Sequence, residues 1–180
     1  MTMTRREFVW AASFVAAGAA GLRAAGPLEV LILRSGEEPK GDDIHLSDVG
    51  KARAKALAQW IPATYGKPDF LFASKPTAKS RRATETLEPL AAALHLKVQE
   101  PFASADSVKL AARLLKEPEF AGKRIVICWM RGGIPDLAMA LGAAKPPAWP
   151  DTQYDHIWRL QFAAGGVKLE DAAQKVSLGK

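Results

Sequence analysis

Three arginines that follow apolar runs could together bind an anion. Arg34 ends the run "LEVLIL" and is followed by Ser35 and Gly36, and Arg131 comes directly after "RIVICWM". Arg82 lies a few residues beyond a third run, "PDFLFAS". Guanidinium groups bind phosphate or carboxylate through forked, charge-assisted hydrogen bonds. The pattern therefore predicts an oxyanion site, and the question it raises is whether Ser35 performs chemistry there.

The apolar runs are expected to be buried strands, because they are short and rich in Leu, Ile and Val. Between them the spacing of apolar residues predicts amphipathic helices over 46–61, 81–94, 105–120 and 134–143. Strands that alternate with helices indicate an α/β three-layer sandwich, with a mainly parallel sheet and helices on both faces. Ligands bind such sheets beyond the carboxyl ends of the strands, where the three arginines are expected to meet.

Helical spacing also predicts which side chains face the core. In the first helix, which Ser47 is expected to cap, these are Val49, Ala52, Ala56, Leu57 and Trp60. In the third they are Val108, Leu110, Ala111, Leu114 and Leu115. The run "HIWRLQF" is expected to be an edge strand.

The first 26 residues have the pattern of an export signal. Arg5 and Arg6 precede an alanine- and valine-rich run that ends in small residues, which is typical of the twin-arginine (Tat) route. We expect cleavage near Ala20 or Ala25, a periplasmic location and no stable membrane insertion of the mature chain. The pattern thus predicts a folded domain over 27–165 and a poorly ordered tail over 166–180.

Composition argues against several other classes of protein. The 180 residues include 25 Lys and Arg against 19 Asp and Glu, but no basic block interleaves with aromatic residues, so nucleic-acid binding is not indicated. The single cysteine, Cys128, excludes an internal disulfide and is expected to be a buried small hydrophobe. The three histidines are widely separated and no pair has metal-ligand spacing, so no metal site is expected. No other pattern in the sequence calls for an organic cofactor. The oligomeric state is left open.

Five segments, in the right order, resemble the histidine phosphatase superfamily, whose fold is phosphoglycerate-mutase-like. The family's first strand, with its Arg-His-Gly motif, is similar to "LILRSGEEP", and its Leu-Ser/Thr-x-x-Gly helix to "HLSDVGKARAKALA". Its Ala-Ser…Arg-Ala-x-x-Thr segment is similar to "FLFASKPTAKSRRATETLEPLAAAL". In one variant of the family, the second catalytic histidine lies in the motif Cys-Trp-His-His-Gly-Asn-Ile-Pro, which is similar to "RIVICWMRGGIPDLAMALG". The final strand of that variant is similar to "WPDTQYDHIWRLQF".

The resemblance implies a site in which one histidine attacks phosphorus and a second histidine and two arginines bind the phosphoryl oxygens. A carboxylate protonates the leaving group. This chain has Ser35 at the position of the nucleophilic histidine and Met130 at that of the second histidine, whereas Arg34 and Arg82 are kept. Asp106 matches the position of the acid; its other interpretation is the N-cap of the following helix.

Two histidines are therefore replaced by residues with different chemistry. A serine hydroxyl is a poor nucleophile without an adjacent base, and a thioether neither carries charge nor donates a strong hydrogen bond. We expect a catalytically inactive, phosphatase-like protein whose pocket, lined by Arg34, Arg82 and Arg131, binds phosphate or a phosphorylated small molecule.

Two alternatives stay open at this point. The first is an active phosphomonoesterase in which Ser35 is the nucleophile, which requires a base such as His45 or His156. The second is a structural or interaction module with a vestigial pocket.

Overall fold

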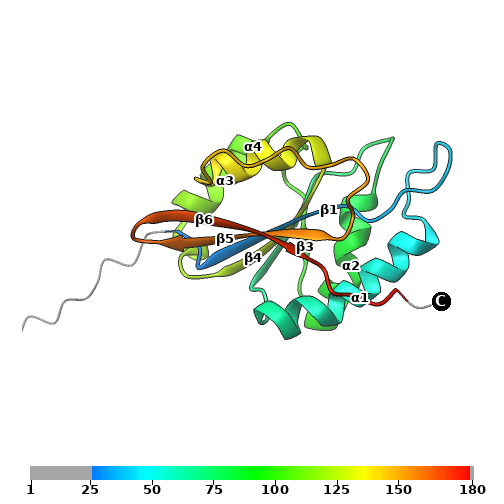
Figure 1. Cartoon of the computed structure of the whole chain (residues 1–180), viewed down its shortest axis with the longest axis horizontal. Coiled ribbons are helices and arrows are strands. Elements are labelled where there is room, and N and C mark those ends of the chain that lie inside the picture. Colours follow the sequence, from blue (N-terminus) through cyan, green and yellow to red (C-terminus); the bar gives the residue numbers. More distant parts are fainter. Residues whose placement is uncertain (1–25, 179–180) are drawn as a thin grey trace, which may run out of the picture.

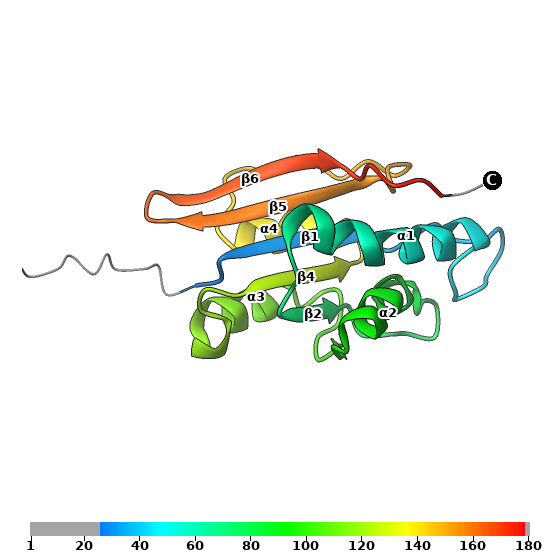
Figure 2. The same cartoon turned by 90° about the horizontal axis from the view of Figure 1, so that it is seen from below.

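A six-stranded sheet forms the middle layer of the computed structural model, which describes residues 26–178 (Figure 1). The strand order is β3-β2-β4-β1-β5-β6, and Figure 2 shows the run from β2 to β6 from below. The strands are β1 Glu29–Arg34, β2 Phe70–Ala73, β3 Val98–Gln99, β4 Arg124–Trp129, β5 His156–Ala163 and β6 Gly166–Ala173. The segment predicted to be an export signal lies outside the described residues, so that assignment and its cleavage site stay predictions.

The sheet is parallel at its centre and antiparallel at one side. β1 pairs with β4, β4 with β2 and β2 with β3 in parallel, whereas β5 and β6 run antiparallel to their neighbours. Arg34 lies opposite Trp129 in the register, and Ala73 lies opposite Cys128. The carboxyl ends of β1, β2 and β4 therefore meet at one edge, as the alternating pattern predicted.

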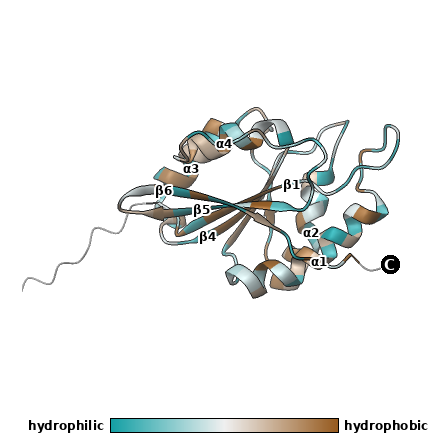
Figure 3. Ribbon diagram, in the orientation of Figure 1, coloured by the Kyte–Doolittle hydropathy of each residue, from teal (hydrophilic) through white to brown (hydrophobic). Residues whose placement is uncertain are grey.

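Helices cover both faces of the sheet (Figure 1). α1 (Asp48–Tyr65) and α2 (Arg82–Leu94) cover one face, and α3 (Ser107–Lys116) and α4 (Ile134–Ala140) cover the other. Side chains alternate along β1, so that Val30 and Ile32 join the core beneath α3 and α4 while their neighbours join the other core. The central strands are accordingly the most apolar part of the fold (Figure 3). The expected α/β sandwich is confirmed.

The N-cap of α1 is confirmed, but its predicted inner face is only partly correct. Ser47 Oγ accepts a hydrogen bond from the Gly50 amide at 3.1 Å. Val49 is 51% exposed, because α1 is turned so that Gly50 meets the chain after β1; a Cβ at Gly50 would lie 2.6 Å from the Glu37 carbonyl oxygen. This close approach rotates Arg53, Ala54 and Ile61 into the interior, beside Leu57, which is buried as predicted.

The predicted face of α3 contains a similar error. Val108 is 68% exposed, whereas Ser107 is buried and its hydroxyl donates to the Gly133 carbonyl oxygen at 3.2 Å. The hydrogen bond holds the polar residue inward and so turns the neighbouring valine to solvent. Leu110, Ala111 and Leu114 are buried as expected.

The sheet extends past the boundary expected at residue 165. β6 pairs along the whole length of β5, so β6 rather than β5 is the edge strand on this side. Gln174, just beyond β6, is buried, and its side-chain amide donates to the His156 carbonyl oxygen at 2.7 Å. The domain therefore includes most of the segment that was expected to be a poorly ordered tail. None of the helices within 26–178 is long and apolar enough to cross a bilayer.

Cys128 lies on β4 and is buried in the core between the sheet and the helices α1 and α2, as expected. Burial raises the pKa of its thiol to about 12, because the thiolate would have to form without solvent. Only the thiolate reacts with alkylating reagents. We expect negligible alkylation of the native chain at about pH 8 and rapid alkylation in denaturant, measured by the mass shift with time. Labelling of the native chain at the rate of a free thiol would contradict this burial.

Candidate anion-binding site

The carboxyl ends of β1 and β4 and the start of α2 enclose a cavity of about 190 Å³. Arg34 is the last residue of β1 and Ser35 follows it, while Met130 follows β4 and Arg131 begins a short 3-10 helix. Arg82, the first residue of α2, completes the set. The structure thus brings together five of the six residues that the sequence nominated for the site.

Arg34 is held at the base of this cavity and is 8% exposed. Its Nη1 donates to the Asp151 carbonyl oxygen at 2.6 Å, and its guanidinium lies 3.7 Å from the centroid of the Tyr154 ring. Its Nε is buried and has no hydrogen-bond partner among the described residues. Burial lowers the pKa of Arg34, but a guanidinium stays protonated at neutral pH, so the cavity contains a partly satisfied cation.

The other two arginines form ion pairs at the mouth of the cavity. Arg82 Nη2 lies 2.8 Å from Glu38 Oε2, and Arg131 pairs with the Asp151 carboxylate. The Glu38 side chain is 55% exposed and that of Asp151 is 80% exposed. Exposed ion pairs contribute about 0–1 kcal/mol, so a bound anion could replace either carboxylate at little cost.

Thr86 links the two segments that supply Arg34 and Arg82. Its Oγ1 accepts from the Gly36 amide at 2.9 Å and donates to the Arg82 carbonyl oxygen at 2.7 Å. Because Gly36 follows Ser35 directly, this one hydroxyl fixes the start of α2 against the end of β1. The threonine of the Arg-Ala-x-x-Thr pattern therefore positions the arginines.

A buried ion pair supports the chain on the other side of Ser35. Arg53 Nη2 lies 2.7 Å from Glu37 Oε1, and Arg53 Nη1 also donates to Gln174 Oε1 at 3.3 Å. Arg53 is 8% exposed. Sequence reasoning did not nominate Arg53, although it lies on the helix that resembles the family's Leu-Ser/Thr-x-x-Gly helix. The pair ties the end of β1 to α1 and to the segment after β6.

Asp106 does not line the arginine cavity. It occupies the N-cap position of α3 without capping the helix, and it pairs with Lys109 at 2.7 Å. The hydrogen bond from Lys109 lowers the pKa of Asp106, which favours the ionised form, whereas a general acid at neutral pH needs a raised pKa. Its role as an acid stays a prediction.

Neither histidine that was considered as a base forms a hydrogen bond with the Ser35 hydroxyl. His45 Nδ1 pairs with Glu85, and His156 Nδ1 lies 2.6 Å from Asp171 Oδ1. Of the described residues that line the cavity with Ser35, Glu38 alone carries a carboxylate, and that carboxylate pairs with Arg82. Within 26–178, no group of three or more His, Cys, Asp or Glu residues is placed to hold a metal ion. The site supplies cations but no free base.

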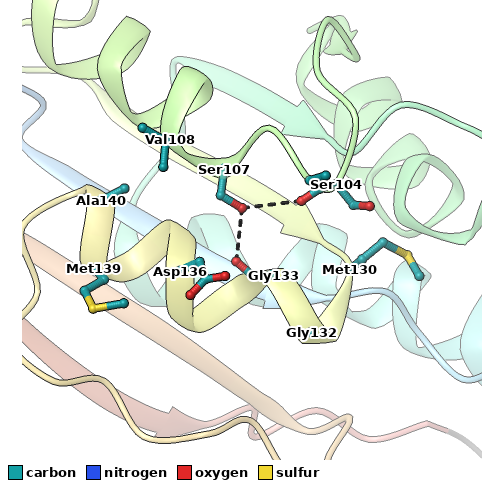
Figure 4. Close-up of a pocket in the computed structure, with 10 residues that line it drawn as sticks. Ser104, Ser107, Val108, Met130, Gly132, Gly133, Asp136, Met139 and Ala140 are labelled. Atoms are coloured by element: carbon teal, nitrogen blue, oxygen red, sulfur yellow. Dashed lines mark hydrogen bonds between the residues drawn. The ribbon is translucent and has the colours of Figure 1, made fainter.

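Met130 lies where three cavities adjoin. Besides the arginine cavity, it lines one of about 280 Å³ beside the 74–82 loop and one of about 750 Å³ between α3 and α4. Figure 4 shows the largest, in which Ser107 hydrogen-bonds the carbonyl oxygens of Gly133 and Ser104. The sequence predicted only that Ser107 belongs to the third helix, and it gave no signal that this residue is buried. Its bonds fix the relative position of α3 and α4.

Comparison by sequence yields no match: no family model matches the chain, and no curated protein matches it. Comparison of the structure does. The protein histidine phosphatase SixA complexed with tungstate has a TM-score of 0.57 and 16% identity, with 81% of this chain and 97% of that chain covered.

Two further solved structures agree. A mycobacterial glucosyl-3-phosphoglycerate phosphatase has a TM-score of 0.55 and 18% identity, with 83% of this chain and 99% of that chain covered. A phosphoserine phosphatase mutant from Entamoeba histolytica, in complex with phosphoserine, has a TM-score of 0.55 and 17% identity, with 82% and 96% covered. At these identities the likeness establishes the fold, which is that of the histidine phosphatases.

Proposed function

We propose that this chain is a phosphatase-like protein that binds phosphate or a phosphorylated small molecule in its arginine cavity without cleaving it. The observation that carries the proposal is the convergence of Arg34, Arg82 and Arg131 on one cavity of about 190 Å³ at the carboxyl ends of the parallel strands. Two of the structures with this fold are complexed with tungstate and with phosphoserine. An oxyanion is therefore the ligand class that the cavity fits best.

The charges of the cavity favour an anion. Three guanidinium groups line it against the single carboxylate of Glu38. The unpartnered Nε of Arg34 is a buried donor, and such donors cost about 1–3 kcal/mol when they stay unsatisfied. An anion oxygen that displaced Glu38 from Arg82 and reached the Arg34 guanidinium would satisfy both arginines through charge-assisted hydrogen bonds.

The same residues argue against catalysis by the family mechanism. Ser35 is 6% exposed, and the histidines considered as its base, His45 and His156, pair with carboxylates elsewhere. Met130 contributes a thioether at the position of a cationic or donor group, so it cannot stabilise the charge that develops on a transferring phosphoryl group. Ser35 and Met130 at the positions of the family's two histidines therefore remove phosphoryl transfer, whereas the arginines that bind the anion are kept.

Titration with inorganic phosphate tests the proposal. We expect saturable binding at one site by calorimetry, with amide chemical shifts that move at Gly36, Arg131 and Gly132, which border the cavity. Binding should weaken as salt rises, because the attraction is electrostatic. Absence of saturable heat together with unmoved shifts at these residues would contradict the proposal and would favour a vestigial pocket.

A further inference from the structure

A second cationic cavity adjoins the arginine site. Its volume is about 280 Å³, and it shares Arg82 and Met130 with the arginine cavity. The remaining wall comes from the loop between β2 and α2, together with Ala83 of α2 and Ser104. A molecule bound by the three arginines therefore has room to extend past Met130 toward this loop.

The side chains that line this cavity are cations and hydroxyls. Lys75 and Lys79 supply two ammonium groups, and the hydroxyl groups come from Ser74, Thr77, Ser80 and Ser104. None of the described residues that line it carries a carboxylate. Neither lysine forms an ion pair with another described residue, whereas two of the three arginines of the neighbouring cavity do. Such a lining binds anions, because lysines supply charge and hydroxyls donate hydrogen bonds.

The loop that holds the two lysines is fixed by its backbone. The Lys75 amide donates to the Phe102 carbonyl oxygen at 2.8 Å, and the Thr77 amide donates to the Ser80 carbonyl oxygen at 2.9 Å. The Arg81 amide donates to the Ile44 carbonyl oxygen at 2.9 Å. A loop that is already ordered loses less conformational entropy when a ligand binds. The cavity is thus built before any ligand arrives.

The cavity on the other side of Met130 has the opposite character. Its lining is mostly small and apolar, and its charged member is Asp136, with Val108 and Met139 exposed at its surface. A second anionic group on the ligand would be repelled by the Asp136 carboxylate and attracted by Lys75 and Lys79. The direction in which an anionic ligand extends is therefore set by charge.

We propose that the ligand of the arginine cavity is a bis-anionic small molecule, whose second phosphate or carboxylate binds Lys75 and Lys79. This inference rests on the proposed function, since it assumes that the first anionic group occupies the arginine cavity. Met130 separates the two anion sites with an uncharged, flexible side chain, which is suited to contact the organic part that joins the two groups.

Calorimetry with three related probes tests this inference. Hexose 6-phosphate carries one anionic group, whereas hexose 1,6-bisphosphate and 6-phosphogluconate carry a second one, as phosphate or carboxylate. We expect one or both bis-anions to bind the natural chain about fivefold to tenfold more tightly than the monophosphate. Whichever of the two shows this preference identifies the second group.

The double variant Lys75→Ala, Lys79→Ala should reduce that preference to about twofold or less and leave the affinity for hexose 6-phosphate nearly unchanged. The matched control Lys116→Ala, Lys168→Ala, which removes two exposed lysines that line neither cavity, should keep it. Bis-anions that bind no more tightly than the monophosphate, or a preference that survives in the Lys75, Lys79 variant, would overturn this inference. Failure of the proposed function looks different, because hexose 6-phosphate binding would then be absent or insensitive to Arg34→Ala.

Discussion

Replacing Arg34 with alanine is expected to weaken phosphate binding by about 10- to 100-fold. Hydrogen bonds to charged groups contribute about 1.5–3 kcal/mol each, and 1.4 kcal/mol corresponds to a factor of ten in affinity. Arg34 is the most buried of the three arginines, so its interaction with an anion is the least screened by solvent. Calorimetric titration of the variant with phosphate measures the loss.

Two further variants make this result specific. Arg34→Lys keeps the charge but loses the planar guanidinium, so its affinity for phosphate should fall between those of the natural chain and Arg34→Ala. The lysine variant also controls for a loss of binding that is caused by misfolding of the alanine variant. Arg81→Ala removes a neighbouring exposed arginine that does not line the cavity, so it should bind phosphate like the natural chain. Unchanged affinity in both Arg34 variants would contradict the anion site.

The double variant Ser35→His, Met130→His is expected to hydrolyse an aryl phosphate at least about 100-fold faster than the natural chain. Loss of a nucleophile from a concerted site costs on the order of 10⁴ to 10⁶ in rate, and an imidazole is a ready nucleophile near neutral pH. Recovery should be partial, because Asp106 is paired with Lys109 and lies outside the cavity lining. Continuous measurement of phenolate release gives the rate.

The matched control for this gain is Ser35→Ala, Met130→His, which introduces one histidine but no nucleophile at position 35. It should stay near background, and only the first variant should form an acid-labile phosphoenzyme. Equal rates in the two variants would contradict this prediction.

The residues at the strand ends could be predicted from sequence because their placement follows from the backbone alone. Parallel strands end at a common edge, so Arg34 and Arg131 had to meet once the strands "LEVLIL" and "RIVICWM" were recognised. Arg82 joined them because Thr86 fixes the start of α2 against Gly36.

Other features depend on tertiary contacts that helical spacing does not encode. Val49 and Val108 were expected inside because they are apolar, but the close approach of Gly50 to Glu37 and the bond from Ser107 to Gly133 set the rotation of their helices. A polar residue that is buried by one specific hydrogen bond gives no periodic signal.

The last strand was missed for a related reason. β6 lies at the sheet edge, and its residues alternate between exposed and partly buried, which leaves a weak hydrophobic pattern. Its main anchor beyond the ladder, Gln174, is polar and is buried because it bonds the backbone of β5 and the guanidinium of Arg53. Both partners are far away in sequence.

The most direct test of the central claim, that the cavity binds an anion without cleaving it, is phosphate release from an aryl phosphate by the natural chain beside Ser35→Ala. Both proteins should release phosphate at the background rate while the natural chain still binds phosphate by calorimetry. Turnover by the natural chain that Ser35→Ala abolishes would contradict the account and would identify Ser35 as a nucleophile.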